Sequence, residues 1–300
     1  MDREYLDISN STDGADTARI SLHGGGLRAL TLHGRVVIPL DLEDSFARWY
    51  TGVVMAPFAN RVRDGRWMHD GVLHQLPLND PLGHALHGLV AERLFTVVAR
   101  TPNSVVIECT VPAVPGYPFA TTLHVAYVID DTGLTSTMTI TNESDISVPV
   151  SLGAHPYFMW GEGSSIEVRA AAMWEVDERL IPTGTRVDPA ARGIGSDIAT
   201  NLAGLRLDDT FTDLERDDDC RAHVLLRHAD GACVDIWQGE GFAHTVIFTC
   251  PEGIWRDSDA HAIAIEPQTS PTDALNSGVD VVWVEPGASR MFTWGVSISR

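Results

Sequence analysis

Alternation of apolar and polar residues with a period of two constrains the fold of this chain more than any other feature. In residues 121–130, TTLHVAYVID, every second side chain from Leu123 onward is apolar, and residues 134–142, LTSTMTITN, continue the pattern after the turn DDTG. Because successive side chains of a strand point to opposite faces, each segment has one face for a core and one for solvent. The two segments therefore predict an antiparallel hairpin.

Similar segments recur along the chain, whereas helical patterns are scarce. Residues 18–38 form a further strand pair through three consecutive glycines, and residues 281–299 form another that turns at EPGAS. Shorter strands are expected at 223–228, 232–237, 244–250 and 261–266. Residues 41–55 hold a turn or two of helix at most, and neither repeats nor linkers divide the sequence. We predict one all-β domain over residues 1–300, a large antiparallel β-sandwich with few short helices.

The charge balance excludes several classes of partner. The chain has 21 basic and 41 acidic residues, a formal net charge of −20. Such a field repels nucleic acid and anionic membranes, and it suits a neutral small-molecule ligand. No apolar run reaches the roughly 20 residues that span a bilayer. The start, MDREYLDISN, lacks the basic and apolar parts of a secretory signal, so we expect a cytoplasmic protein.

Cysteine spacing gives no sign of a metal or redox motif. The four cysteines are far apart and form no CxxC pair, and several lie in apolar, strand-like runs. We therefore expect small buried side chains in a reducing compartment. The acidic segment 215–220, ERDDDC, is expected to be a solvated loop.

The first candidate for chemistry lies in HAIAIEPQ, residues 261–268. A strand here places Ala262, Ala264 and Glu266 on one face, and the two alanines leave room beside the carboxyl. We expect Pro267 to end the strand, since proline cannot donate to a ladder. A cleft base and a rim glutamate in a salt bridge both fit this segment.

The second candidate lies in SLGAHPYF, residues 151–158. The same reasoning places Ser151, Gly153 and His155 on one face of a strand, and Pro156 restricts His155 to an extended backbone. Aromatic residues that could stack on a ring follow directly. The imidazole fits a proton donor held against a ring-shaped substrate, and it also fits a structural histidine.

Histidines cluster in the region that ends with HALHGLV, residues 84–90. Gly88 permits an unusual backbone or a close approach next to His87. No cysteine lies nearby and no HExxH spacing occurs, so we predict no metal site. The clustered histidines are His69, His74, His84 and His87.

Two shorter segments supply polar groups that could bind a ligand. Asn60 and Arg61 precede a turn at Asp64-Gly65, and the arginine can make a forked contact to oxygens. LDDTF, residues 207–211, places Asp208 shortly before an aromatic ring. Turn chemistry and simple solvation are the alternative interpretations.

The order of these segments resembles the aldose 1-epimerase family, the galactose mutarotase-like proteins. The resemblance rests on Asn60-Arg61 before a glycine turn, Leu86-His87-Gly88, and His155 with the aromatic pair after it. It continues with a D-x-x-F from Asp208 to Phe211 and a late Glu266-Pro267-Gln268, with Asp273 and Asn276 downstream.

The resemblance implies a β-sandwich isomerase that interconverts α and β anomers of an aldose without a cofactor. By motif, His155 would be the general acid and Glu266 the general base, while His87 would orient and polarise the sugar. Asn60, Arg61 and Asp208 would bind hydroxyls.

The residue types agree with this chemistry. Anomer exchange removes a proton from the C1 hydroxyl and adds one to the ring oxygen, and a carboxylate with an imidazolium can do both. We expect the two groups on opposite sides of one pyranose. We also expect the Glu266 charge to favour protonated His155, and burial to raise the pKa of the carboxyl.

Several departures from galactose-specific members leave the sugar open. Pro156 and Met159 differ from the residues that commonly follow the histidine and the aromatic pair, and Leu89 follows the LHG segment. A late glutamine is replaced by Val246, with Gln238 as an unaligned substitute.

Two other functions fit the same residues. A hexose 6-phosphate epimerase would need further cations at the cleft, for which Arg28, Arg63 and Arg66 are available. A carbohydrate-binding sandwich would have no need of the acid/base pair. Either a monomer or a homodimer is expected.

Overall fold

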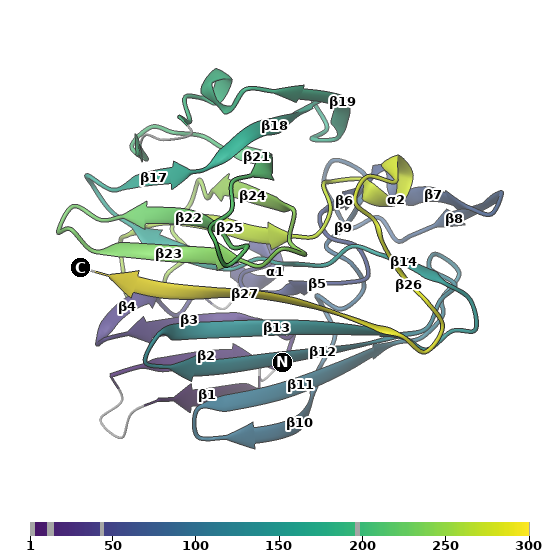
Figure 1. Ribbon diagram of the computed structural model, residues 1–300, viewed down its shortest axis with the longest axis horizontal. Coiled ribbons are helices and arrows are strands. Elements are labelled where there is room, and N and C mark those ends of the chain that lie inside the picture. Colours follow the sequence, from purple (N-terminus) through teal and green to yellow (C-terminus); the bar gives the residue numbers. More distant parts are fainter. Residues whose placement is uncertain (1–3, 11–14, 43–44, 196–198, 300) are drawn as a thin grey trace.

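The computed structural model describes residues 4–10, 15–42, 45–195 and 199–299, and most regular structure in them is antiparallel strand (Figure 1). Within these ranges the helices are short: α1 (Ser45–Trp49), α2 (Ala274–Ser277) and the 3₁₀ turns η1 (Arg63–Gly65) and η2 (Pro189–Arg192). The predicted all-β class with few short helices is confirmed.

A nine-stranded sheet forms one large layer of the molecule. Its order is β10-β11-β12-β13-β27-β23-β22-β17-β20. The corresponding bounds are Thr96–Thr101, Ser104–Val111, Thr121–Asp130, Gly133–Asn142, Ser289–Ser299, Cys233–Gln238, Ala222–Arg227, Ser165–Val168 and Thr200–Asn201.

An eight-stranded sheet carries most of the residues discussed below. Its order is β19-β18-β21-β24-β25-β15-β5, and β16 also pairs with β25. The bounds in that order, with β16 last, are Pro182–Val187, Ala170–Val176, Asp208–Leu214, His244–Thr249, His261–Gln268, Gly153–Ala154, Val54–Met55 and Tyr157–Trp160.

Smaller sheets complete the fold. A four-stranded sheet is built from the N-terminal strands, of which β1 lies beside β11 and β12 (Figure 1). Three two-stranded sheets are formed by the pairs β14-β26, β6-β9 and β7-β8. The strands β1 to β4 span Tyr5–Ser9, Thr17–Ser21, Leu27–Leu32 and Arg35–Ile38; the pairs span Val148–Val150 with Val282–Val284, Arg61–Val62 with Ala85–Leu86, and Arg66–His69 with Val72–Gln75.

The predicted strand pairs agree with the sheets in all but one case. The hairpin β12-β13 closes through the pair Asp130 and Gly133, and β2-β3 forms across the three glycines. The prediction that residues 281–299 form one pair is wrong. Strand β27 is inserted between β13 and β23 and has both edges occupied, so β26 pairs with β14 instead.

The apolar faces of the sheets meet in a continuous core. One cluster of buried apolar side chains extends from Ile8 to Val296, and it includes the alternate residues of β11, β12 and β13. This cluster supports the single domain over residues 1–300, which stays a prediction.

The four cysteines differ in burial. Cys109 and Cys250 are buried, Cys233 is half-buried and Cys220 is exposed, and all four are free. The segment 215–220 is largely exposed. In the described residues, no helix is long and apolar enough to cross a membrane.

The backbone of Gly26 lies so close to that of Gly52 that we expect no larger residue to be tolerated at position 26. A Cβ atom on Gly26 would lie 1.7 Å from the Gly52 carbonyl oxygen. We expect Gly26→Ala to lower the free energy of unfolding by about 2 kcal/mol or more, since neither backbone can give way. Urea denaturation followed by fluorescence measures the change.

Gly34→Ala is the matched control. Its φ of +71° is left-handed, but nothing lies within 4 Å of a Cβ there. Only the backbone strain of about 1 kcal/mol is expected. Equal losses in the two variants would contradict the steric explanation.

Candidate active site

A row of side chains crosses one face of the eight-stranded sheet. Asp208 of β21 is paired with Phe248 of β24, which is paired with Ala264 of β25, which is paired with Tyr157 of β16. Residues directly opposite each other in antiparallel strands share a face. The small side chain of Ala264 lets the rings of Phe248 and Tyr157 meet edge-on, with centroids 6.5 Å apart.

Glu266 lies two residues further along β25, on the same face. Its strand does not end at Pro267 as predicted, because β25 continues to Gln268. Pro267 occupies the point where the neighbouring strand changes from β16 to β15, so its missing N–H interrupts no ladder. Gln268 thus shares the face of Glu266, and its amide nitrogen donates to Oε2 at 3.0 Å.

His155 occupies the break between β15 and β16 instead of lying within one strand. Its N–H donates to the carbonyl of Val53, and its carbonyl accepts from the N–H of Gly52, both at 2.9 Å. The ring stacks on Tyr157 with centroids 5.1 Å apart. The position of the imidazole is therefore fixed through the backbone, as Pro156 led us to expect.

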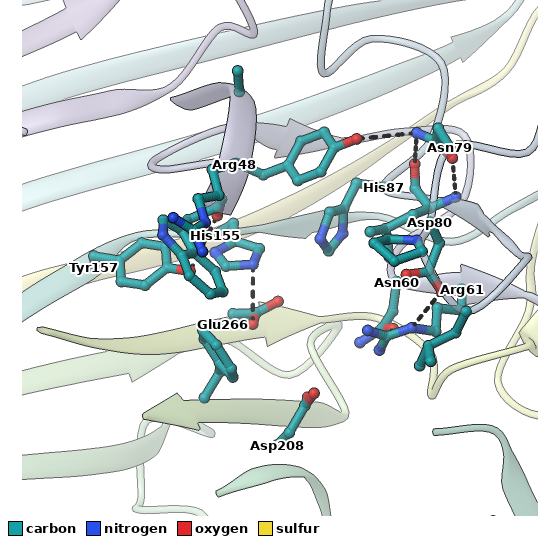
Figure 2. A pocket seen from close by; sticks show the side chains of 17 residues that line it. Arg48, Asn60, Arg61, Asn79, Asp80, His87, His155, Tyr157, Asp208 and Glu266 are labelled. Atoms are coloured by element: carbon teal, nitrogen blue, oxygen red, sulfur yellow. Dashed lines mark hydrogen bonds and ion pairs between the residues drawn. The ribbon is translucent and has the colours of Figure 1, made fainter. Parts of the chain in front are cut away.

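His155 and Glu266 are in contact. Nε2 of His155 lies 3.4 Å from Oε1 of Glu266, and the two side chains are only 6% and 2% exposed (Figure 2). The expectation that a sugar ring separates them is wrong. Both residues border the break between β15 and β16, and their separation of 3.4 Å leaves no space for a ring between them.

The strand pair β6-β9 brings Asn60, Arg61 and His87 together. Arg61 is paired with Leu86, and the N–H of His87 donates to the carbonyl of Asn60 at 2.9 Å. Gly88 is required here, because a Cβ on it would lie 2.2 Å from the carbonyl oxygen of Ala56. The ring of His87 meets the ring of His155 edge-on, with centroids 4.9 Å apart.

One cavity of about 490 Å³ is lined by all six predicted residues. Arg61 and Asn60 lie on one side of it and Tyr157 on the other, with His155 and Glu266 between them (Figure 2). The predicted residues are Asn60, Arg61, His87, His155, Asp208 and Glu266; the others that line it are Ala47, Arg48, Trp49, Tyr50, Asn79, Asp80, Pro81, Leu82, Leu86, Tyr157 and Phe248.

Sequence reasoning missed several polar contacts of the cavity. Oδ2 of Asp80, a residue that no motif singles out, lies 3.1 Å from Nε of Arg61. Asn79 and Tyr50 come from separate loops that no motif connects. Gln268 could have been found by extending the period-two pattern through Pro267.

The neighbouring histidines have other roles. Nδ1 of the buried His84 accepts from the N–H of Asp64, so its Nε2 donates to the carbonyl of Arg179 at 3.2 Å. His69 and His74 pack against Trp67. In the described part of the chain, no group of three His, Cys, Asp or Glu could hold a metal ion.

Asp273 and Asn276 lie outside the cavity and hold the backbone next to it. Oδ1 of Asp273 accepts from the N–H of Arg63 at 2.9 Å and from the side-chain amide of Asn276 at 2.7 Å. Gln238 does not line the cavity, because its amide donates to the carbonyls of Phe242 and His244.

Burial shifts the pKa values of the central pair in opposite directions. Loss of water lowers the pKa of His155 from 6.5 to about 3. Burial, with the nearby charge of Asp208, raises the pKa of Glu266 well above 4.5. The predicted rise in the pKa of Glu266 is confirmed, but the expectation that the Glu266 charge keeps His155 protonated is wrong, because desolvation is the largest cause of the shift at His155.

Two other titratable groups follow the same rule. Burial raises the pKa of Asp208, and the negative charges of Asp209 and Asp80 oppose its ionisation further. Burial also lowers the pKa of His87 well below 6.5. Both histidines of the cavity are therefore neutral at physiological pH.

Comparison with known proteins shows the family of the chain. The model of the family described as aldose 1-epimerase matches residues 8–296. The chain belongs to the aldose 1-epimerase family.

Two individual relatives share about a third or less of their aligned residues with this chain. An uncharacterized protein, YihR, of Escherichia coli (strain K12) is 28% identical over 90% of this chain and 86% of its own length. Galactose mutarotase of Rattus norvegicus is 34% identical over 45% of this chain and 42% of its own length.

Solved structures share the whole fold. A putative aldose 1-epimerase from Escherichia coli K12 and the GalM/aldose epimerase homologue from C. elegans both superpose with a TM-score of 0.83. Each covers 99% of both chains, at 18% and 20% identity respectively.

The raised pKa of Glu266 predicts that this side chain destabilises the folded protein at neutral pH. The carboxyl ionises less readily in the folded protein than in the unfolded chain. The folded protein therefore has its full stability below the usual pKa of 4.5 and loses stability as the pH rises toward the higher pKa of the folded state. We expect Glu266→Gln, which mimics the neutral acid, to be more stable than wild type at pH 7. Urea denaturation at several pH values measures this.

The advantage should shrink as the pH falls and disappear well below 4.5, where the wild-type carboxyl is neutral in both the folded and the unfolded state. A difference in stability that does not change with pH would contradict the proposed burial effect.

Proposed function

We propose that this protein is an aldose 1-epimerase that interconverts the α and β anomers of a free aldose, with Glu266 and His155 as the proton-transfer pair. The observation that carries the proposal is the 3.4 Å contact between a buried carboxyl and a buried imidazole at a cavity of about 490 Å³. A cavity of this size fits a small-molecule ligand.

The contact suits the chemistry better than the separation predicted from sequence. The hydroxyl that loses a proton and the ring oxygen that gains one are both bonded to C1 of the sugar. A base and an acid that contact each other can therefore reach both oxygens from one side of the ring.

The two opposite pKa shifts are compatible with an acid/base role. Neutral Glu266 with neutral His155 holds as many protons as carboxylate with imidazolium, and the two forms differ only in which atom carries one proton. Burial favours the neutral form in the free protein. The ionised form has the base and the acid that ring opening needs.

Ring opening then follows from the ionised form. The Glu266 carboxylate takes the proton of the C1 hydroxyl while the His155 imidazolium gives its proton to the ring oxygen. The bond between C1 and the ring oxygen breaks and a C1 carbonyl forms. The pair is left neutral, which is the state that burial favours.

Closure on the other face reverses each step. Rotation about the C1–C2 bond presents the other face of the carbonyl, and the C5 hydroxyl attacks C1. That hydroxyl returns its proton to His155, and Glu266 returns its proton to the C1 oxygen. The protein regains its starting state, and no step uses a cofactor.

Polar groups around the pair would hold the sugar. Arg61 and Asn60 contact each other at 3.3 Å and could donate to hydroxyls, and Asp208 could accept from them. Neutral His87, edge-on to His155, could orient the sugar beside it. Phe248 and Tyr157 offer an apolar wall for the C–H face of the ring.

The charges of the cavity favour a free sugar over a 6-phosphate. Among the described residues, two cationic side chains line it, Arg61 and Arg48, and each has a carboxylate partner, Asp80 and Glu252. The cations that the phosphate alternative required lie elsewhere.

Those three arginines are already engaged. Arg28 is buried against Asp41. Arg63 lies near Asp177 and Asp273, and Arg66 donates to Gln75.

A cytoplasmic location and a monomeric or homodimeric state stay predictions.

Loss of the base tests the proposal. We expect the wild type to accelerate the exchange of freshly dissolved α-aldoses, and Glu266→Gln to lower kcat about 10²- to 10⁴-fold. Polarimetry or NMR of the anomeric protons follows the reaction. Glu285→Gln, at an exposed position outside the cavity, serves as the control.

Each other outcome has a meaning. Exchange that requires a 6-phosphate would support the second function considered from sequence. Sugar binding without exchange would support a binding protein, and either result would overturn the proposal.

The shared proton predicts a flat pH dependence. The singly protonated pair is the active form, and the lowered pKa of His155 and the raised pKa of Glu266 widen its range on both sides. We expect no loss of kcat/KM as the pH falls from neutral toward the lowered pKa of His155, and a loss only as the pH rises through the raised pKa of Glu266. A single limb centred near 6.5, as for an isolated histidine, would contradict a pair that acts together.

A further inference from the structure

Tyr50 is a cavity residue that the mechanism has not used, and its backbone is unusual. It follows α1 with a φ of +50°, in the left-handed region. Helices commonly end with a residue in this conformation, but glycine or asparagine normally supplies it. A larger side chain there costs roughly 1 kcal/mol, and such strain is concentrated at functional sites.

The segment that carries Tyr50 is tied to the proton-transfer pair. Gly52 and Val53 exchange backbone hydrogen bonds with His155, both at 2.9 Å. The ring of Tyr50 meets the ring of His87 edge-on, with centroids 4.9 Å apart. The phenol is therefore held at a fixed place in the wall of the cavity.

Asn79 determines the direction of the hydrogen bond at the Tyr50 hydroxyl. The backbone N–H of Leu86 can only donate, and it reaches Oδ1 of Asn79 at 2.7 Å. The other side-chain atom is therefore the amide nitrogen, which donates to the carbonyl of Leu86 at 3.1 Å and to the Tyr50 hydroxyl at 3.2 Å. The Tyr50 oxygen accepts, and its own proton remains available.

Tyr157 shows the contrasting arrangement. Its hydroxyl donates to the carbonyl of Trp49 at 3.1 Å, so its proton is already used. In the part of the chain that the structure describes, the Tyr50 hydroxyl makes a single hydrogen bond, as an acceptor. Burial and the charge of Glu92 raise the pKa of Tyr50, so the phenol keeps its proton at neutral pH.

We propose that Tyr50 is a substrate-binding residue that donates a hydrogen bond to a sugar hydroxyl other than the one at C1, and that Asn79 is the positioning residue that directs its proton into the cavity. This inference rests on the proposed function for the identity of the ligand. The C1 and ring oxygens belong to Glu266 and His155, so Tyr50 acts on binding and not on proton transfer.

Tyr50→Phe keeps the ring and removes the donor. We expect KM for the preferred aldose to rise about three- to ten-fold, with kcat within about two-fold of wild type, as for the loss of one neutral hydrogen bond. Tyr5→Phe, on β1 and outside the cavity, is the control that removes a phenol elsewhere. An unchanged KM, or a large loss of kcat at constant KM, would overturn the proposal.

Deoxy sugars identify the contact. Wild type should discriminate against one of the 2-, 3-, 4- and 6-deoxy analogues through Tyr50, and Tyr50→Phe should reduce that discrimination for this analogue alone. A merely structural role of Tyr50 would alter all analogues alike, and that result would overturn the proposal.

Asn79→Asp tests the positioning role. A carboxylate only accepts, so the Tyr50 proton would turn toward it and away from the sugar. We expect the single variant to resemble Tyr50→Phe, and the double variant to be no worse than either. Additive losses would mean that Asn79 acts independently of Tyr50.

A binding measurement separates the two proposals. Calorimetric titration of the same sugars into Glu266→Gln, with and without Tyr50→Phe, reads binding without turnover. Weaker binding with Tyr50→Phe supports the Tyr50 contact even where wild type shows no exchange, and equal binding overturns it alone. Absence of both exchange and binding in wild type would overturn the proposed function and this inference together.

Discussion

Desolvation of a carboxyl and an imidazole in contact is the constraint on which the site depends. Removing water penalises the charged form of each group, so the Glu266–His155 pair is neutral where an exposed pair would be ionised. The same proton can lie on either partner without changing the total. A buried pair of this kind destabilises the fold when it loses that proton, and the proposed proton transfer would require both groups at one place.

The sheet and the loops contribute different parts of the cavity. Strands β21, β24, β25 and β16 hold Asp208, Phe248, Glu266 and Tyr157 in register on one face. Loops supply the walls, and each has its own anchor. The wall after α1 is bonded to the backbone at His155, and the wall before β9 is held by the hydrogen bonds of His84.

Much of this arrangement was predictable from the sequence, because strand periodicity sets which side chains share a face. That rule placed Glu266 on the face of Ala264, and the proline after His155 led us to expect an imidazole whose position the backbone fixes. The rule failed at Pro267, since a proline is tolerated where the neighbouring strand is interrupted. It also could not find Asp80 or Tyr50, whose positions depend on how separate loops fold over the sheet.

Division of the cavity between a sheet floor and loop walls limits how relatives of this protein can diversify. A strand in the middle of a sheet cannot shift by one residue without turning its side chains to the opposite face, so the side chains that the strands contribute, among them Glu266 and Asp208, keep their places together. The walls have no such restriction, since insertions and exchanges in loops are tolerated. Under the proposed function, new sugar preferences would arise by remodelling of loops around an unchanged reaction.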